Sequence, residues 1–191
     1  MEVEFLIRRS RSLGLRVLLL FVLLLVVPGT RSQPTGVDEY RAKAAFIYNF
    51  CKFVSWPKQP PQRGNQPFIF GVVGNRPFAK VIAQELSGKT IGGRAIQVRE
   101  FSRLREADKA SVVYCTAEDL RKLLKPRRER LREQSVLTVG DGGHFLSAGG
   151  MLELGIKNNQ LAFGVNLGAS RRSGLQVDPN LLNLAETVVE K

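Results

Sequence analysis

The stretch Phe68-Ile69-Phe70-Gly71-Val72-Val73 is a continuous apolar run of strand length, and the residues after it indicate the kind of sheet it enters. Gly74-Asn75-Arg76 forms a turn, and Pro77 suits the first turn of a helix that we expect to run to about Leu86. A strand that is apolar on both faces and leads into a helix is typical of a mainly parallel sheet with helices on both sides. This stretch therefore predicts an α/β fold.

The same alternation of strands and helices continues along the chain. Apolar runs predict strands over 95–101, 110–115 and 136–139, and a hairpin over 151–156 and 160–166 around a turn at 157–159. Helical spacing and capping residues predict helices over 37–54, 117–124 and 178–189. The predicted architecture is a single three-layer α/β domain with a mainly parallel sheet and an antiparallel hairpin portion.

Residues 1–32 have the layout of a secretory signal peptide. Four arginines precede an apolar run from Val17 to Val27, and Pro28-Gly29-Thr30-Arg31-Ser32 then breaks that run. The run is about half of the roughly 20 apolar residues that a membrane-spanning helix needs, which favours a cleaved signal over a retained anchor. We therefore expect 1–32 to be a signal peptide, with its cleavage position open, and 33–191 to be an exported periplasmic domain.

The net charge and the expected export together limit the classes of partner. The chain carries a formal charge of +12, and residues 1–32 contribute five arginines and two glutamates to it, which leaves about +9. A basic protein would ordinarily suggest nucleic acid, but an exported chain meets little of it. We expect no nucleic acid and no cofactor, at most peripheral contact with an anionic membrane surface, and an acidic protein face as the alternative.

The densest basic segment is the run from Lys125 to Glu133. Glu129 and Glu133 are interleaved among its five cations, which favours a solvated helix or loop with local ion pairs. A recognition patch is the alternative, although no aromatic residue interleaves to stack on bases.

The sequence contains no convincing catalytic or metal-binding constellation. His144 is the only histidine, whereas a catalytic zinc site commonly uses two or three, and no Gly-x-Ser-x-Gly motif frames a serine. We expect a conformationally special loop around Gly140-Asp141-Gly142-Gly143, and a protein that is not an enzyme. The residues proposed to contact a partner or ligand are Trp56, Asn75, Asp141, His144, Asn166, Arg171 and Arg172.

Cys51 and Cys115 allow two interpretations. An oxidising compartment permits a disulfide between them, which would close a long loop and stabilise the fold by about 4 kcal/mol in the chain-entropy model. The alternative is two buried thiols that pack as small hydrophobic groups.

Several segments in order resemble the YfiR family of periplasmic proteins. The resemblance rests on Lys43–Phe50, Phe53–Pro57, Phe70–Asn75, Pro77-Phe78, Val136–Gly140, Gly149–Met151, Leu161–Asn166, Leu181-Leu182 and Leu184-Ala185. It implies an exported α/β domain that binds the periplasmic sensor portion of a membrane diguanylate cyclase and holds it inactive. Release would raise cyclic-di-GMP and promote biofilm behaviour, and no catalytic residues are carried over.

The resemblance leaves the partner and the redox behaviour open. Its best-known member resembles a redox-sensitive dimer with additional disulfides, so a homodimer is an open alternative here. Only Cys115 matches such a cysteine, Cys51 lies in the first predicted helix, and the later cysteine pair is absent around 141–151. The resemblance also allows a sensor kinase as the partner. The alternative function is a small-ligand-binding module at the strand ends near Gly74, Gly140 and Asn166 that serves such a kinase.

Overall fold

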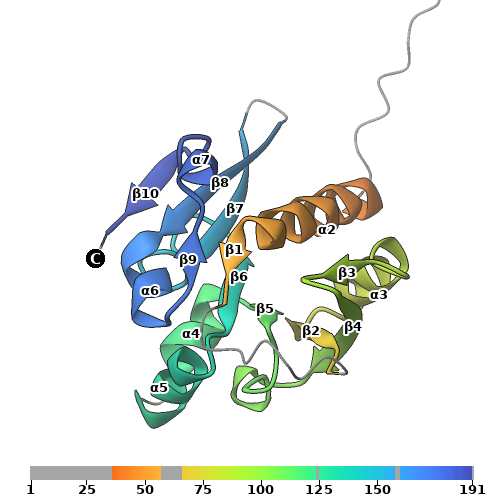
Figure 1. The fold of residues 1–191 in the computed structure, drawn as a ribbon, viewed down its shortest axis with the longest axis horizontal. Coiled ribbons are helices and arrows are strands. Elements are labelled where there is room, and N and C mark those ends of the chain that lie inside the picture. Colours follow the sequence, from red (N-terminus) through yellow and green to blue (C-terminus); the bar gives the residue numbers. More distant parts are fainter. Residues whose placement is uncertain (1–35, 57–65, 124, 158–159, 191) are drawn as a thin grey trace, which may run out of the picture. The chain divides into compact units, whose positions relative to one another are not determined.

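The computed structural model describes residues 36–56, 66–123, 125–157 and 160–190, which form an α/β domain (Figure 1). The predicted signal peptide lies outside the described residues. Within the described ranges, no helix combines the length and the apolar character that a membrane crossing requires.

The described strands form one large sheet of eight strands and one small sheet of two. The order in the large sheet is β10-β8-β7-β6-β5-β2-β4-β3. Its strands are β2 (Phe68–Val73), β3 (Thr90–Ile91), β4 (Arg94–Phe101), β5 (Val112–Tyr114), β6 (Leu137–Asp141), β7 (Leu152–Lys157), β8 (Gln160–Asn166) and β10 (Thr187–Val189). Only the β7–β8 and β3–β4 pairs are antiparallel, which confirms the mainly parallel sheet with a hairpin portion.

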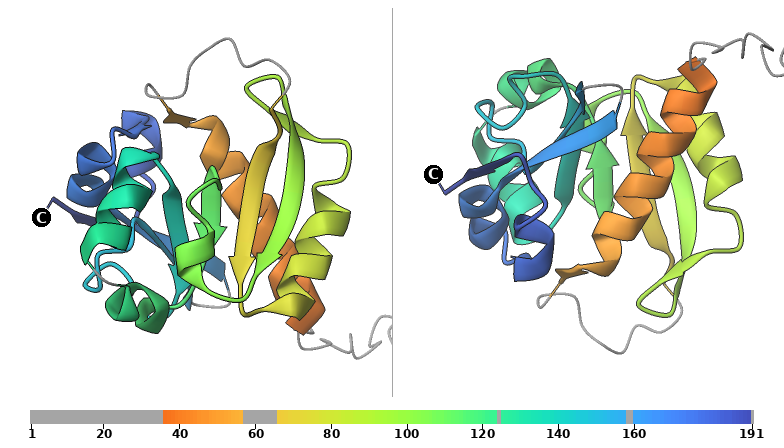
Figure 2. Two further views of the ribbon diagram at one scale, coloured as in Figure 1. Left: turned by 90° about the horizontal axis from the view of Figure 1, so that it is seen from below. Right: turned by 90° about the horizontal axis from the view of Figure 1, so that it is seen from above.

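Helices cover both faces of the large sheet. Phe68, Phe70 and Val72 point into one hydrophobic cluster, while Ile69 and Val73, which alternate with them on β2, point into another. The first cluster is covered by α2 (Gly36–Lys52), α3 (Arg76–Glu85), α6 (Leu167–Arg172) and α7 (Pro179–Leu182). The second is covered by η1 (Leu104–Glu106), α4 (Ala117–Lys122) and α5 (Lys125–Glu133). Figure 2 shows the two faces, with α2 in front of the sheet in one view and behind it in the other. The three-layer prediction is confirmed.

The order of the strands creates a switch point in the sheet. From β2 the chain passes through α3 to β4 on one side, and from β5 it passes through α4 and α5 to β6 on the other. The crossovers run in opposite directions and their helices lie on opposite faces, as right-handed connections require. The carboxyl ends of β2 and β5 therefore flank the crevice in which doubly wound α/β proteins usually bind ligands.

Two of the helix predictions extend too far. The first helix ends at Lys52, and Val54 instead belongs to β1 (Val54–Ser55), which pairs with β9 (Gln176–Val177). The last helix is only Pro179–Leu182, and Thr187–Val189 forms edge strand β10 beside β8. Thr187, Val188 and Val189 are β-branched, so pairing with an available sheet edge is favoured over helix continuation.

A glycine-rich loop replaces a helix between β6 and β7. Residues 142–151 connect these parallel strands, and Gly142 and Gly149 adopt φ of 86° and 93°. The loop folds back over the second cluster because the Phe145 ring is fully buried there. A Cβ at Gly140 would lie 2.4 Å from that ring, and one at Gly150 would lie 2.2 Å from it. The predicted special loop is thus confirmed.

Candidate functional site at the strand ends

A cluster of mutually bonded polar side chains lies at the carboxyl ends of the central strands. Asp141 is the last residue of β6, Tyr114 is the last residue of β5, and Asn75 follows β2 by two residues. Helix α2 lies over the same end and contributes Glu39 and Lys43. We call Glu39, Lys43, Tyr114 and Asp141 the strand-end cluster.

Lys43 is the centre of this cluster. Its Nζ lies 2.5 Å from Oδ2 of Asp141 and 2.5 Å from Oε1 of Glu39, and its side chain is only 6% exposed. The Tyr114 hydroxyl donates to the same Asp141 Oδ2 at 2.6 Å. A buried cation thus faces two carboxylates, as burial of a charge requires.

The pKa shifts in the cluster hold both proton donors in their protonated forms. Burial by itself would lower the pKa of Lys43, but the hydrogen bonds and charges of Asp141 and Glu39 outweigh it and raise the pKa. Burial, and then the hydrogen bond and charge of Asp141, raise the pKa of Tyr114. A general acid or base works best with a pKa near the operating pH, so neither group is suited to proton transfer at neutral pH.

Aromatic side chains close the crevice beside the cluster. The Tyr40 ring of α2 packs on Phe78 at 5.0 Å between centroids, and Phe78 packs on Tyr114 at 4.6 Å. Asn75 caps α3 by accepting from the Phe78 amide, and its Nδ2 lies 3.5 Å from the Tyr40 hydroxyl. The first helix of the domain therefore fills the switch-point crevice with its own side chains.

The proposed contact residues do not form one site. Asn75 and Asp141 both contact α2, through Tyr40 and Lys43, at the carboxyl ends of the central strands. Trp56 lies at the opposite, amino-terminal end of the central strands, where its ring packs edge to face on Phe68 at 5.4 Å between centroids. Asn166 also lies toward that end, because β8 runs antiparallel to β7. The strand ends near Gly74, Gly140 and Asn166 therefore do not converge, and the prediction that they share one ligand site is wrong.

Asn166 and Arg172 line a separate hollow of about 640 Å³ next to the glycine-rich loop. Its polar lining comprises Ser147, Glu153, Asn166, Arg172, Glu186 and Thr187. The side chain of Asn166 makes hydrogen bonds within the domain. Its Oδ1 accepts from the Ala169 amide and so caps α6, and its Nδ2 donates to the Leu146 carbonyl. His144 and Arg171 are exposed nearby, on the loop and on α6.

Cys51 and Cys115 are free, buried thiols in this structure. Cys51 belongs to the first cluster and Cys115 to the second, so the large sheet separates them. The disulfide that an oxidising compartment would permit is therefore not formed, and the packing alternative describes their environment. Burial raises the pKa of both thiols, with the charge of Asp119 adding to the effect at Cys115.

Sequence reasoning missed Glu39, Lys43 and Tyr114 as site residues. A signal was present at Lys43, which follows Tyr40 by three positions and precedes Ile47 by four, and so falls on the apolar stripe of the first helix. A lysine on a buried face requires an anionic partner. The sequence could not identify Asp141 as that partner. Within the described residues, no group of three or more potential ligands could hold a metal ion.

The fold and the site define a class: a doubly wound α/β domain whose switch-point crevice is closed by its own first helix. The chain belongs to the YfiR/HmsC-like family, DUF4154, whose model matches residues 40–186. This match confirms the family resemblance of the sequence. At the level of the family, its members are periplasmic, non-catalytic regulators that act on membrane diguanylate cyclases.

Comparison with solved structures gives a likeness of fold alone. A crystal structure of a conserved domain protein from Vibrio cholerae O1 biovar El Tor matches with a TM-score of 0.53 at 11% sequence identity. The match covers 78% of this chain and 60% of the Vibrio chain. Comparison with curated proteins finds no match.

Proposed function

We propose that this protein inhibits a membrane-bound diguanylate cyclase by binding its periplasmic sensor domain, and so lowers cyclic-di-GMP. The observation that carries the proposal is the family match, which spans nearly the whole described domain. Inhibition by binding requires that the protein prefer the inactive state of the sensor, because equal affinity for both states shifts nothing.

The strand-end cluster supports a contact function over a catalytic one. Lys43 and Tyr114 are held protonated, and the crevice beside them is filled by α2. A rigidly held first helix also provides a fixed surface for a partner, and preorganisation reduces the cost of association.

An exposed apolar surface on the α2 side is the contact region we propose. We define the aromatic surface as Phe46, Phe53, Ile156 and Leu161. Phe46 packs on Phe163 at 5.0 Å, and Ile156 and Leu161 pair across β7 and β8 on the same face as Phe163. Phe53 and Ile156 are 48% and 54% exposed. Large apolar side chains exposed together commonly mark protein interfaces.

The test uses a variant that leaves the core intact. Phe53→Ser with Ile156→Ser should abolish crosslinking to the membrane cyclase and restore cyclic-di-GMP in cells that produce the protein. The matched control is Val37→Ser with Leu184→Ser, which removes similarly exposed apolar side chains elsewhere and should inhibit like the wild type. If the wild type neither crosslinks to a cyclase nor lowers cyclic-di-GMP, the proposal fails.

The hollow of about 640 Å³ supports a second candidate, a small-ligand-binding module that serves a membrane sensor kinase. Its size is that of a small-molecule site, and its lining mixes glycine backbone with carboxylates and Arg172. A thermal-shift screen with metabolites distinguishes the candidates, because a ligand at 100 times its dissociation constant stabilises by about 2.7 kcal/mol.

A further inference from the structure

The strongest unassigned feature is a basic surface on the face opposite α2. Between residues 103 and 133 the chain carries ten lysines and arginines against six acidic residues. These residues belong to η1, α4 and α5 and the segments that join them, and all three elements cover the second cluster. We call this the η1–α5 surface.

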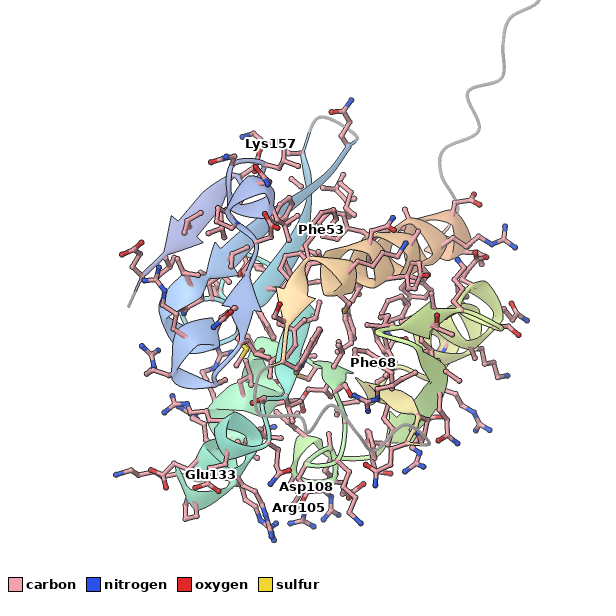
Figure 3. All side chains as sticks on the ribbon, in the orientation of Figure 1. Phe53, Phe68, Arg105, Asp108, Glu133 and Lys157 are labelled. Atoms are coloured by element: carbon pink, nitrogen blue, oxygen red, sulfur yellow. The ribbon has the colours of Figure 1, made fainter. Side chains whose placement is uncertain are left out.

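The η1–α5 surface is held together by its own contacts. Arg130 Nε lies 3.7 Å from Asp108, which joins α5 to the segment after η1, and Arg128 donates to the Leu120 carbonyl of α4 at 2.7 Å. Figure 3 shows Arg105, Asp108 and Glu133 along the same edge of the domain. These contacts bring the segment after η1, α4 and α5 side by side on this surface.

Half of the acidic residues are engaged within the surface. Asp108 pairs with Arg130, Glu118 pairs with Lys122 at 2.6 Å, and Asp119 completes the capping box of α4. The expected local ion pairs along the basic run are therefore replaced, at Arg130, by a pair with a distant segment. Arg105, Lys125 and Arg127 remain exposed at the rim.

Helix α5 begins with charges of the unfavourable sign. Lys125, Arg127 and Arg128 lie at its start, and its first turn holds no acidic residue. The positive end of a helix dipole disfavours cations by roughly 0.3–1 kcal/mol each, so the charges of Lys125 and Arg127 do not stabilise the start of α5, whereas Arg128 is held by its bond to the Leu120 carbonyl. A surface that retains a destabilising arrangement is a candidate for binding an anion-rich partner.

The composition of the surface limits how it could bind. Among the described residues, the exposed large apolar side chains are Val37, Phe53, Ile156, Leu184 and Val188, and none lies between 103 and 133. Binding would therefore be electrostatic and peripheral, without insertion of apolar groups into another phase. A dense array of headgroup charges suits such a surface, because each cation near an anionic bilayer contributes independently.

We propose that the η1–α5 surface docks the protein on an anionic phospholipid surface. This proposal is independent of inhibition of a cyclase, because it concerns the chain and lipid alone. A regulator of a membrane enzyme that also contacts the bilayer would search for its partner in two dimensions, with the aromatic surface on the other face of the sheet left accessible.

The test is sedimentation with vesicles, using two charge-matched variants. The test variant is Arg105→Gln, Lys125→Gln and Arg127→Gln, and the control is Lys52→Gln, Arg76→Gln and Lys80→Gln on α2 and α3. All six side chains are exposed, so both variants should fold. Vesicles contain phosphatidylcholine alone or with about a third phosphatidylglycerol, and each cation lost from the η1–α5 surface should weaken binding roughly fivefold.

We expect the wild type and the control to bind the phosphatidylglycerol vesicles within a factor of about three of each other. The test variant should bind roughly a hundredfold more weakly. Binding of the wild type should fall when salt rises from about 0.05 M to about 0.5 M. Equal binding to phosphatidylcholine alone, equal loss in both variants, or no binding overturns the proposal. Wild type that binds soluble polyglutamate but no vesicles also overturns it and assigns the surface to an acidic protein.

Discussion

Lys43 and Asp141, which lie 98 residues apart in the chain, meet through a 2.5 Å hydrogen bond between Nζ and Oδ2. This contact joins the first helix to the end of a central strand, and Tyr114 adds a second bond to the same oxygen. Because Lys43 is almost completely buried, the bond fixes the position of α2 over the switch-point crevice.

Replacing Lys43 with methionine should destabilise the fold by about 2–3 kcal/mol, because Asp141 and Glu39 lose their cation while Tyr114 still supports Asp141. The effect should fall below that of a fully buried pair, since the Asp141 side chain is 32% exposed. Urea denaturation followed by circular dichroism measures it. Lys52→Met, an exposed change on the same helix, should alter stability by less than about 0.5 kcal/mol; equal effects would contradict a special role for Lys43.

Stability should fall in alkaline solution. Lys43 and Tyr114 have pKa values raised above their ordinary 10.5 and 10.0. The unfolded chain therefore loses these protons at a lower pH than the folded protein does. The stabilisation is complete below the ordinary pKa values and is lost as pH rises above about 10. Urea midpoints measured across that range should fall less steeply for Tyr114→Phe than for wild type. The raised pKa values of both thiols act in the same direction in both proteins, so the difference isolates the tyrosine.

Gly140→Ala should destabilise the domain by about 2–3 kcal/mol, because the new methyl group would overlap the Phe145 ring and the Cys115 carbonyl. Neither neighbour can withdraw, since one is a buried ring and the other is backbone. Gly155→Ala is the control, because no atom lies within 4 Å of a Cβ at that position. Thermal denaturation of the two variants measures the difference, and similar midpoints would show that the loop relaxes around the methyl group.

Cys51 and Cys115 should both be unreactive thiols in the folded protein, because burial raises the pKa of each. Protein purified without reductant should react slowly with an aromatic disulfide reagent when native. After denaturation, the reagent should release its coloured thiolate in the amount expected for two thiols per chain. No reaction in denaturant would mean that the two cysteines are bridged, contrary to their separation by the sheet.

The elements that could be predicted from the sequence are those that local chemistry decides. Phe68–Val73 is a strand with the expected bounds, and a helix begins at Ala117 as expected, capped by Thr116, whose side chain accepts from the Asp119 amide. The antiparallel pairing of β7 with β8 likewise confirms the hairpin strands that the sequence predicts over 151–156 and 160–166. The predicted continuation of the last helix failed at Thr187–Val189, where an available edge of β8 decided the outcome.

The sequence by itself determined the α/β class, the special glycine loop and the family, since apolar runs, capping residues and ordered motifs are local properties. Only the tertiary structure decided that Lys43 pairs with Asp141, that Cys51 and Cys115 lie on opposite faces, and that Asn166 and Asn75 lie toward opposite ends of the strands. The physical reason is that strand order and direction set these distances, and both depend on pairings between segments far apart in the chain.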